Sequence, residues 1–441
     1  MIQTVENIGE KLVSMLTYDA SQPLIFSSGL FLFLFAGFLF FYGFTRRAPM
    51  ARIVYVILFS LYFYYKSSGI YFLLLVFASV SDYWIAHAIY KVRTQRAKYW
   101  LVGLSVLVNL GMLGYFKYTN FLIEIANNLF GQGFLNFQNI FLPVGISFFV
   151  FQSMSYTIDI CRGQLKPLNN WADYLFYLSF FPQLVAGPIV RAKDFIPQIR
   201  QNPLRVTREM FGMGVFLILI GLFKKAVISD YISLNFVDRI FDEPLLYSGF
   251  VCLMGIYGYA LQIYCDFSGY SDMAIGIALL LGFRFPKNFD APYKSATITE
   301  FWRRWHISLS TWLRDYLYIS LGGNRKGRIR TYFNLLVTML LGGLRNGAAA
   351  RFILWGALHG IALALHKLWL SVVPGSKATG AEMRWFWRIP GIFFTFNLVC
   401  FGWLMFRAES MKTVQLMLHQ IFTNFNPSVI PQVLEGYAGI F

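Results

Sequence analysis

Two of the five histidines lie where an imidazole could do chemistry. His306 sits in TEFWRRWHISLSTWLRDYLY, a stretch with three tryptophans and three arginines, and His359 sits in the apolar run ILWGALHGIALALHKLW. An imidazole titrates near neutral pH, so it can take a proton from a hydroxyl group and return it. Ionisable residues are costly in an apolar run, which makes His359 a candidate for function. Each also fits a structural role, His306 by bonding a neighbouring carbonyl or headgroup and His359 by linking two buried helices.

A second group of polar residues lies between apolar flanks in YCDFSGYSDMAIG. Asp266 and Asp272 are six residues apart, a spacing that does not place them on one face of a helix. Gly269 between them predicts a break in the helix. Two interpretations remain open: the carboxylates are charge-paired at a kink, or Asp266, Ser268 and Tyr270 line a polar cavity.

Other motifs narrow the kinds of site that we expect. The run GGNRKG follows no predicted strand, so it favours a flexible basic turn near headgroups or a nucleotide phosphate over a P-loop. The four cysteines form no CxxC pair, so we expect no metal site and no redox motif. Pro182, Gly187 and Pro188 interrupt an apolar run. Broken helices at membrane depth survive where they are buried or line a cavity, so these residues fit an internal polar chamber.

The composition indicates the class of protein that carries these residues. Of the 441 residues, 57% are hydrophobic and 13% are charged, whereas soluble domains carry about 25% charged residues. The apolar runs are continuous rather than alternating, which favours membrane-spanning helices over a transmembrane barrel. The formal net charge is +17. Because the basic residues lie in short loops beside apolar runs, this charge indicates membrane topology and anionic lipid or donor rather than nucleic acid.

We therefore predict an all-α, polytopic integral membrane protein with about 11 transmembrane or re-entrant helices of roughly 20 apolar residues each. Basic loops follow the first and third predicted spans, so both spans should end in the cytoplasm and the N terminus should lie outside. The clear predicted spans are 24–44, 51–65, 70–90, 99–117, 211–229, 249–264, 332–344, 351–373 and 389–406, and the shorter or broken ones are 139–158, 172–190 and 271–283.

The segment 291–330 is predicted to be an interfacial amphipathic helix rather than a span. Thr297 followed by Glu300 fits a capping box, so the helix should begin near Ile298, and Gly322 and Gly323 should end it. One side of this helix would be mostly apolar and the other basic. The apolar side would carry Trp302, His306, Leu309 and Leu313, and the basic side Arg303, Arg304 and Arg314.

Taken together, these runs resemble the membrane-bound O-acyltransferase family, and within it the bacterial alginate O-acetyltransferase branch. The resemblance covers about 26–410 of a chain that we read as a single domain, 1–441. The matching runs are FLPVGISFFVFQSMSYTIDICRG, FFPQLVAGPIVR, YCDFSGYSDMAIGIALLLGFRFPKNFDAPY, ITEFWRRWHISLSTWLRDYLYISLGGNRKG, FILWGALHG and FGWLMFRAES.

The resemblance implies a many-helix fold around a central tunnel in the bacterial inner membrane. The acyl donor would be acetyl-CoA or an acyl-carrier thioester presented from the cytoplasm, with no tightly bound cofactor. The acceptor hydroxyl, on an exopolysaccharide or partner protein, would be reached from the other side, usually with a periplasmic partner. Relatives that serve teichoic acid D-alanylation share the same core, so D-alanyl-type transfer to a cell-envelope polymer is a further possibility.

The sequence departs from the family pattern at one important place. The Arg-Trp-His motif of the family maps to His306. A second motif, Leu-Trp-His-Gly, holds the histidine usually treated as catalytic, and here it reads LRNG, with Arg345 for Trp and Asn346 for His. An asparagine can orient a hydroxyl or a carbonyl, but it cannot accept a proton. The chain could therefore be an inactive variant, could use His306 or His359 as the base, or could bind a donor without transferring the acyl group.

Two hypotheses follow, an O-acyltransferase and a non-catalytic scaffold or transporter of the same pathway. In the first, His306 would deprotonate or position the acceptor, Asn346 would hold it or the thioester carbonyl, and His359 would support them. Arg303, Arg304, Lys326 and Arg328 would attract the anionic donor. The expected substrate or tunnel residues are Trp302, Arg303, Arg304, Trp305, Ser310, Arg314, Asp315, Asp266, Ser268 and Tyr270.

Overall fold

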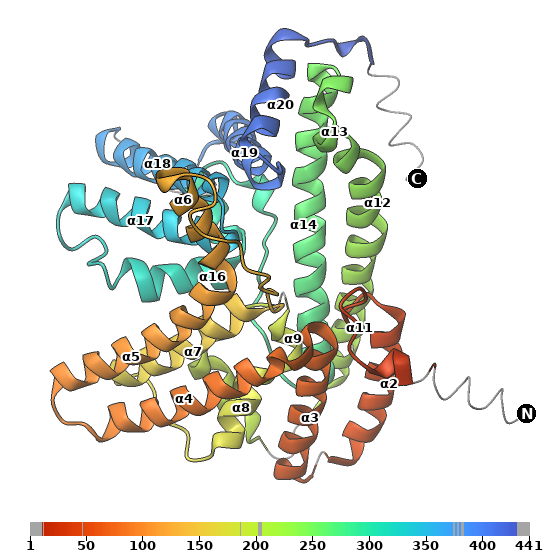
Figure 1. The fold of residues 1–441 in the computed structure, drawn as a ribbon, viewed down its shortest axis with the longest axis vertical. Helices are drawn as coiled ribbons and strands as arrows, with labels where there is room; N and C mark the ends of the chain where they lie inside the picture. The colour runs from red at the N-terminus through yellow and green to blue at the C-terminus, as the bar shows by residue number, and fades with distance from the viewer. Residues whose placement is uncertain are drawn as a thin grey trace, which may run out of the picture. The chain divides into compact units, whose positions relative to one another are not determined.

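The protein is described by a computed structural model that covers residues 11, 13–45, 47–185, 187–201, 205–373, 375–376, 379–380 and 383–429. Throughout these residues the regular structure is helical, which confirms the predicted all-α class (Figure 1). The chain folds into two compact units, Met1–Leu219 with Asp272–Pro286, and Ile220–Ser271 with Lys287–Phe441. The predicted external N terminus lies outside the described residues.

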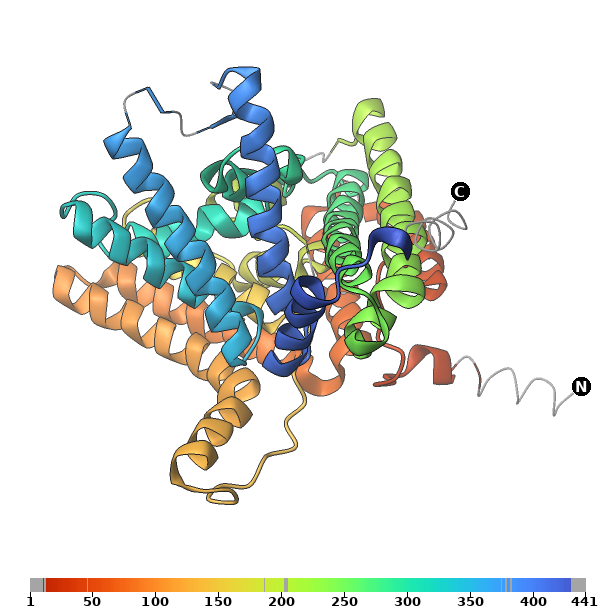
Figure 2. The same ribbon diagram turned by 90° about the horizontal axis from the view of Figure 1, so that it is seen from above.

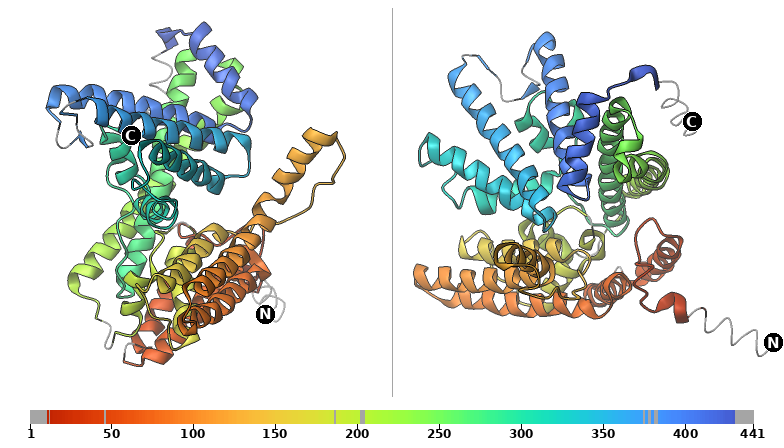
Figure 3. Two further views of the ribbon diagram at one scale, coloured as in Figure 1. Left: turned by 90° about the vertical axis from the view of Figure 1, so that its left-hand side faces the viewer. Right: turned by 45° about the horizontal axis from the view of Figure 1, so that its top comes forward.

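The first unit is a set of packed helices in which α4, α5 and α7 lie side by side. Figure 2 shows α4 and α5 running together, and Figures 2 and 3 show α6 standing away from them. The elements are α2 (Gly29–Tyr42), α3 (Pro49–Ser68), α4 (Phe72–Lys91), α5 (Gln95–Leu113), α6 (Thr119–Phe130), α7 (Ile146–Cys161), α8 (Trp171–Ser179), α9 (Phe181–Leu184), α10 (Ala192–Ile199) and most of α11 (Arg208–Leu222).

A buried carboxylate ties the helices of the first unit together. Asp82 of α4 has no exposed surface. It accepts hydrogen bonds from Ser105 Oγ (2.6 Å) and Asn109 Nδ2 (2.6 Å) of α5, and from Ser153 Oγ of α7. A buried charge is costly unless donors surround it. These three bonds therefore make the α4–α5–α7 arrangement more specific than apolar packing alone would.

The second unit holds the predicted interfacial segment and the C-terminal helices. In it α17 and α18 form a closely packed pair (Figure 1). A β-carbon on Gly343 would lie 2.2 Å from the carbonyl oxygen of Phe352, and one on Gly356 would lie 2.4 Å from that of Met339. Small residues allow membrane helices to approach this closely. The elements are α12 (Asp230–Ile232), α13 (Asp238–Asp242), α14 (Gly249–Leu280, shared with the first unit), α15 (Ile298–Arg304), α16 (Ile307–Trp312), α17 (Arg328–Asn346), α18 (Ala350–Val372), α19 (Trp385–Arg407) and α20 (Met411–Thr423).

Among the described residues, six helical segments are long and apolar enough to cross a membrane. They support a multi-pass membrane protein, but they do not confirm the predicted count of about 11 helices. The predicted span 24–44 corresponds to a shorter apolar helix, and the predicted span 332–344 forms α17, which is not among the six. The six are Pro49–Lys91, Gln95–Phe130, Arg208–Asp242, Gly249–Leu280, Ala350–Val372 and Trp385–Arg407.

The predicted helix break at Gly269 is wrong. The expected spans 249–264 and 271–283 are one continuous helix, α14. A β-carbon on Gly269 would lie 2.8 Å from the carbonyl oxygen of Gly221. The glycine is therefore required by the close approach of the preceding helix, a tertiary cause that is invisible in the local sequence.

The interfacial segment begins as predicted but does not continue as one helix. Thr297 Oγ1 accepts a hydrogen bond from the Glu300 amide (3.1 Å), so α15 begins at Ile298. The helix then stops at Arg304, and α16 starts only after His306. Two backbone hydrogen bonds with the upstream residues 288–290 accompany the break: the amide of Ile307 donates to the Asn288 carbonyl (2.9 Å), and the amide of Asp290 donates to the Arg304 carbonyl (2.9 Å).

This break overturns the predicted alignment of Trp302, His306 and Leu309 on one face of a single helix. A π-helical stretch, Leu313–Tyr318, follows α16. The predicted stop at the glycine pair is confirmed, because Gly322 and Gly323 both have positive φ angles (108° and 55°) that favour glycine.

We predict that Asp82→Leu destabilises the protein by about 1–3 kcal/mol, because it leaves buried hydrogen-bond donors without an acceptor. Asp82→Asn should cost less, since its amide oxygen still accepts. The measurement is the thermal unfolding midpoint in detergent, with Asp194→Asn, an exposed aspartate of the same unit, as the matched control. Equal midpoints for Asp82→Leu and the control would show that the buried carboxylate does not stabilise these helices.

Candidate active site

His306 combines an uncommon backbone conformation with a buried side chain. It lies between α15 and α16 with φ = 43°, a left-handed conformation that is uncommon for a residue other than glycine. Its side chain is 3% exposed. Nδ1 lies 3.1 Å from Asn288 Oδ1, whereas Nε2 is buried with no hydrogen-bond partner in the described part of the chain. Of the two structural partners that the sequence allowed, a carbonyl and a headgroup, the structure shows an amide carbonyl oxygen.

The end of α17 comes close to His306. Burial in an apolar setting lowers the pKa of His306 well below its usual value, and the nearby positive charge of Arg345 lowers the pKa further. Arg345 is itself 7% exposed. Asn346, the last residue of α17, is partly buried. The LRNG motif therefore contributes its arginine to the electrostatic surroundings of His306, and both burial and this charge favour the neutral imidazole.

His359 occupies an aromatic cage instead of joining His306. The His359 ring centroid lies 4.7 Å from that of Trp355, 5.2 Å from Trp302 and 6.3 Å from Phe301. Neither ring nitrogen of His359 has a hydrogen-bond partner within the described ranges. A β-carbon on Gly402 of α19 would lie 2.9 Å from Nε2, so this glycine makes room for the imidazole. The predicted hydrogen-bonded link between helices is not seen.

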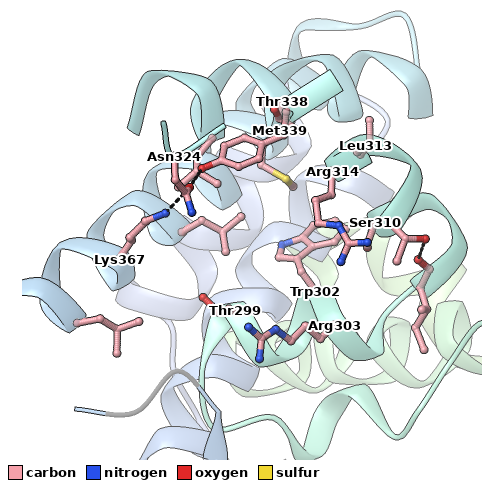
Figure 4. Close-up of a pocket in the computed structure, with 16 residues that line it drawn as sticks. Thr299, Trp302, Arg303, Ser310, Leu313, Arg314, Asn324, Thr338, Met339 and Lys367 are labelled. Carbon is pink, nitrogen blue, oxygen red and sulfur yellow. Dashed lines mark hydrogen bonds between the residues drawn. The ribbon is translucent and has the colours of Figure 1, made fainter. Parts of the chain in front are cut away.

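A pocket of about 480 Å³ lies between α15, α16, α17 and α18 (Figure 4). It combines three basic side chains with aliphatic and hydroxyl groups. Trp302 lines the pocket and also contacts the His359 ring, so it connects the pocket with the aromatic cage of His359. The basic residues are Arg303, Arg314 and Lys367, the aliphatic ones include Leu313, Leu335, Met339, Leu363 and Leu370, and the hydroxyl groups belong to Thr299, Ser310, Thr311, Tyr318 and Thr338.

Polar contacts hold part of this wall in place. Lys367 Nζ donates to Asn324 Oδ1 (2.8 Å), and the Tyr318 hydroxyl donates to the same oxygen. Arg314 forms an ion pair with Asp315 (2.6 Å) and remains 61% exposed. Arg303 is exposed beside the pocket. The pocket thus offers positive charge together with an apolar interior, a combination that suits an anionic head and a less polar arm.

Several predicted substrate residues lie elsewhere. Arg304 forms an ion pair with Glu300 (2.9 Å) and does not line the pocket. Trp305 is buried in the aromatic core of the second unit, with its ring centroid 4.9 Å from that of Trp403. Both residues therefore fix the position of α15 rather than contact the pocket.

The carboxylate group around Asp266 is charge-paired without a kink. Lys225 Nζ lies 2.6 Å from Asp266 and 2.7 Å from Asp230, which supports the ion-pair interpretation over a cavity. Ser268 and Tyr270 are buried (1% and 7% exposed) and do not line the pocket. These residues of α14 therefore do not belong to the pocket.

Sequence reasoning missed Asn288, Lys367 and the pocket lining contributed by α17. Asn288 lies in the quoted run KNFDAPY, but nothing in its spacing from His306 indicates contact. Lys367 follows His366 near the end of the apolar run that holds His359, where a basic residue is typical of the end of a span. In the structure Thr299 Oγ1 lies 2.7 Å from His366 Nδ1, beside the pocket. Hydrophobic periodicity indicates which face of a helix is buried, but it does not indicate which other helix packs against that face.

Comparison with known proteins gives a consistent result. The model of MBOAT, the membrane-bound O-acyltransferase family, matches residues 164–410. A probable alginate O-acetylase of Azotobacter vinelandii is 43% identical, covering 91% of this chain and 78% of that protein. A peptidoglycan O-acetyltransferase of Helicobacter pylori is 36% identical over 90% of this chain and 79% of its own. A teichoic acid D-alanyltransferase of Streptococcus thermophilus is 30% identical over 72% and 77%.

We predict that the imidazole of His306 stays neutral as the pH falls through 6.5, because burial and Arg345 both disfavour its charged form. Arg345→Gln should raise the pKa of His306 while leaving it below the usual value, since burial is the larger cause. The measurement is an NMR titration of histidine-labelled protein in nanodiscs, with His306→Gln to assign the signal. A midpoint near 6.5 in the unmodified protein would contradict the prediction.

Proposed function

The chain belongs to the membrane-bound O-acyltransferase family, and on that premise we propose that it moves an acetyl or short acyl group from a cytoplasmic thioester to an extracytoplasmic hydroxyl. It is an O-acyltransferase of the branch that contains the alginate O-acetylases. The donor would be acetyl-CoA or an acyl-carrier thioester. The acceptor would be a hydroxyl of an envelope or exported polysaccharide, reached with a periplasmic partner from a protein of the inner membrane.

The pocket beside α15 is the observation that carries the donor side of this proposal. Both donor types have a phosphate group on a pantetheine arm that ends in the thioester. Arg303, Arg314 and Lys367 supply positive charge for the phosphate, and the leucines and Met339 supply an apolar wall for the arm. A volume of about 480 Å³ suits the arm rather than a whole nucleotide, which would leave the nucleotide or carrier protein outside.

The same segment offers the group that would handle the proton. In acyl transfer the acceptor oxygen attacks the thioester carbonyl carbon, the carbon–sulfur bond breaks, and the hydroxyl proton finally reaches the departing thiolate. The uncharged Nε2 of His306 is the candidate carrier of that proton. Because His306 is buried, water would be excluded from the reacting atoms, and hydrolysis of the thioester would be limited.

Asn346 and His359 have supporting parts in this proposal. Asn346 would hold the thioester carbonyl or the acceptor by hydrogen bonds, since its amide both donates and accepts. His359 contacts Trp302, which lines the donor pocket, so it would act through the position of that indole. Neither residue needs to accept the proton if His306 does.

Asn346 also motivates a second candidate, a non-catalytic scaffold or transporter of the same pathway. The residue lacks a titratable nitrogen where the family pattern has a histidine. A chain of this kind would bind or conduct a donor and release no acylated product. D-alanyl-type transfer to a cell-envelope polymer is a variant of the enzymatic proposal, supported by the likeness to teichoic acid D-alanyltransferases.

The deciding experiment uses purified protein in nanodiscs with radiolabelled acetyl-CoA and follows both thioester consumption and label on an acceptor. We expect transfer by the unmodified chain and a loss of about 10²–10⁴-fold in His306→Ala, the usual contribution of a general base. Intact transfer in His306→Ala would remove the role assigned to His306.

Asn346→His serves as the companion variant. If only this variant turns over, the unmodified chain is a silenced enzyme. If the unmodified protein and Asn346→His give no product even with an added periplasmic partner, the non-catalytic proposal replaces the enzymatic one.

Neutralising the pocket tests the donor site separately. We predict that Arg303→Gln and Lys367→Gln each raise KM for the donor about fivefold with little change in kcat, because one exposed charge contributes about 1 kcal/mol. High salt should reduce the difference. Arg384→Gln, an exposed arginine outside the pocket, is the matched control. An equal KM for all of these proteins would place the donor elsewhere.

A further inference from the structure

The side-chain oxygen of Asn288 is the polar atom that lies nearest to His306 Nδ1, at 3.1 Å, and Asn288 precedes the histidine by eighteen residues. We infer that Asn288 is a positioning residue that fixes His306 as its Nδ1–H tautomer and so leaves the lone pair of Nε2 free for the acceptor hydroxyl. The inference deepens the proposed function and rests on it for the catalytic use of Nε2. The tautomer itself follows from hydrogen-bond geometry alone.

The orientation of the Asn288 amide is determined by a donor that cannot act as an acceptor. The backbone amide of Ser308 lies 3.2 Å from Asn288 Oδ1, and a backbone N–H can only donate. The atom that faces it must therefore be the oxygen. Ser308 Oγ donates to the same oxygen at 2.9 Å. On the other side of the amide, Nδ2 donates to Ser271 Oγ at 3.0 Å.

The orientation of the amide then decides the tautomer of His306. Nδ1 lies 3.1 Å from Asn288 Oδ1. An oxygen that accepts from Ser308 has no proton to offer, so Nδ1 must carry the hydrogen and donate it. In a neutral imidazole the other nitrogen then holds a lone pair. Nε2 is buried and has no hydrogen-bond partner in the described ranges, so this lone pair is left for a bound group.

Asn288 also holds the backbone on which His306 stands. Its carbonyl oxygen accepts the amide of Ile307 at 2.9 Å. His306 itself has φ = 43°, a conformation that costs free energy and persists only when neighbouring contacts enforce it. Asn288 is 1% exposed. One buried residue thus fixes both the position of the imidazole and the nitrogen that bears its proton.

The direct test is the nitrogen NMR spectrum of histidine-labelled protein in nanodiscs at neutral pH, with His306→Gln to identify the signals. We expect a protonated-type shift for Nδ1 and an unprotonated-type shift for Nε2 of His306. The reverse assignment in the unmodified protein overturns the inference, whatever the variants do.

Two substitutions and a control extend the test to catalysis. Asn288→Leu removes the acceptor, so we expect mixed tautomers and a kcat lowered on the order of 10²-fold with KM for the donor unchanged. Asn288→Asp keeps an acceptor oxygen, so it should retain the Nδ1–H form and a kcat above that of Asn288→Leu. Ser308→Ala leaves the backbone donor in place and should keep the tautomer. A KM increase without loss of kcat would contradict a positioning role.

The outcomes separate this inference from the proposed function. If the NMR shows the Nδ1–H tautomer but His306→Ala still transfers acetyl groups, the base assignment fails and the structural role of Asn288 stands. If His306→Ala is inactive but Nε2 carries the proton, the proposed function stands and the inference about Asn288 is wrong.

Discussion

The arrangement of the second unit depends on a short backbone pairing between residues 288–290 and 304–307. Hydrogen bonds from Ile307 to the Asn288 carbonyl and from Asp290 to the Arg304 carbonyl interrupt what would otherwise be one helix. The interruption turns α15 and α16 into two pieces with different neighbours. As a result Trp302 and Arg303 line the pocket, whereas His306 turns to Asn288 and the end of α17.

Close helix packing makes this geometry possible. The glycines at positions 343, 356 and 402 lie where a side chain would collide with a neighbouring carbonyl or with the His359 imidazole. Gly343 and Gly356 bring α17 and α18 together, so that the wall of the pocket includes Met339 and Lys367. In a membrane, where apolar surface gains little from leaving lipid, such van der Waals contact between backbones contributes much of the helix association.

Buried polar groups are treated in two ways in this protein. Asp82 is surrounded by hydrogen-bond donors, so its polarity is satisfied within the fold. His306 Nε2, both nitrogens of His359 and the indole N–H of Trp302 are buried without such partners in the described part of the chain. Unsatisfied buried groups are costly. Of these residues Trp302 lines the pocket, and other buried side chains in the described part of the chain, such as Gln152 and Arg52, also have atoms without a partner.

The sequence by itself determined the class and the local signals. The apolar runs with few charges predicted a helical membrane protein, and the Thr297–Glu300 pair predicted the start of α15. The run around His306 indicated the family. Only the tertiary structure decided that α14 continues through Gly269, that the helix breaks before His306, that Asn288 contacts the imidazole, and that the charge of Arg345 acts on it. The physical reason is the sequence distance over which each interaction acts. Capping and hydropathy patterns depend on residues a few positions apart. The need for a glycine at a helix crossing, or for Asn288 eighteen residues before His306, depends on a contact between residues that are distant in sequence.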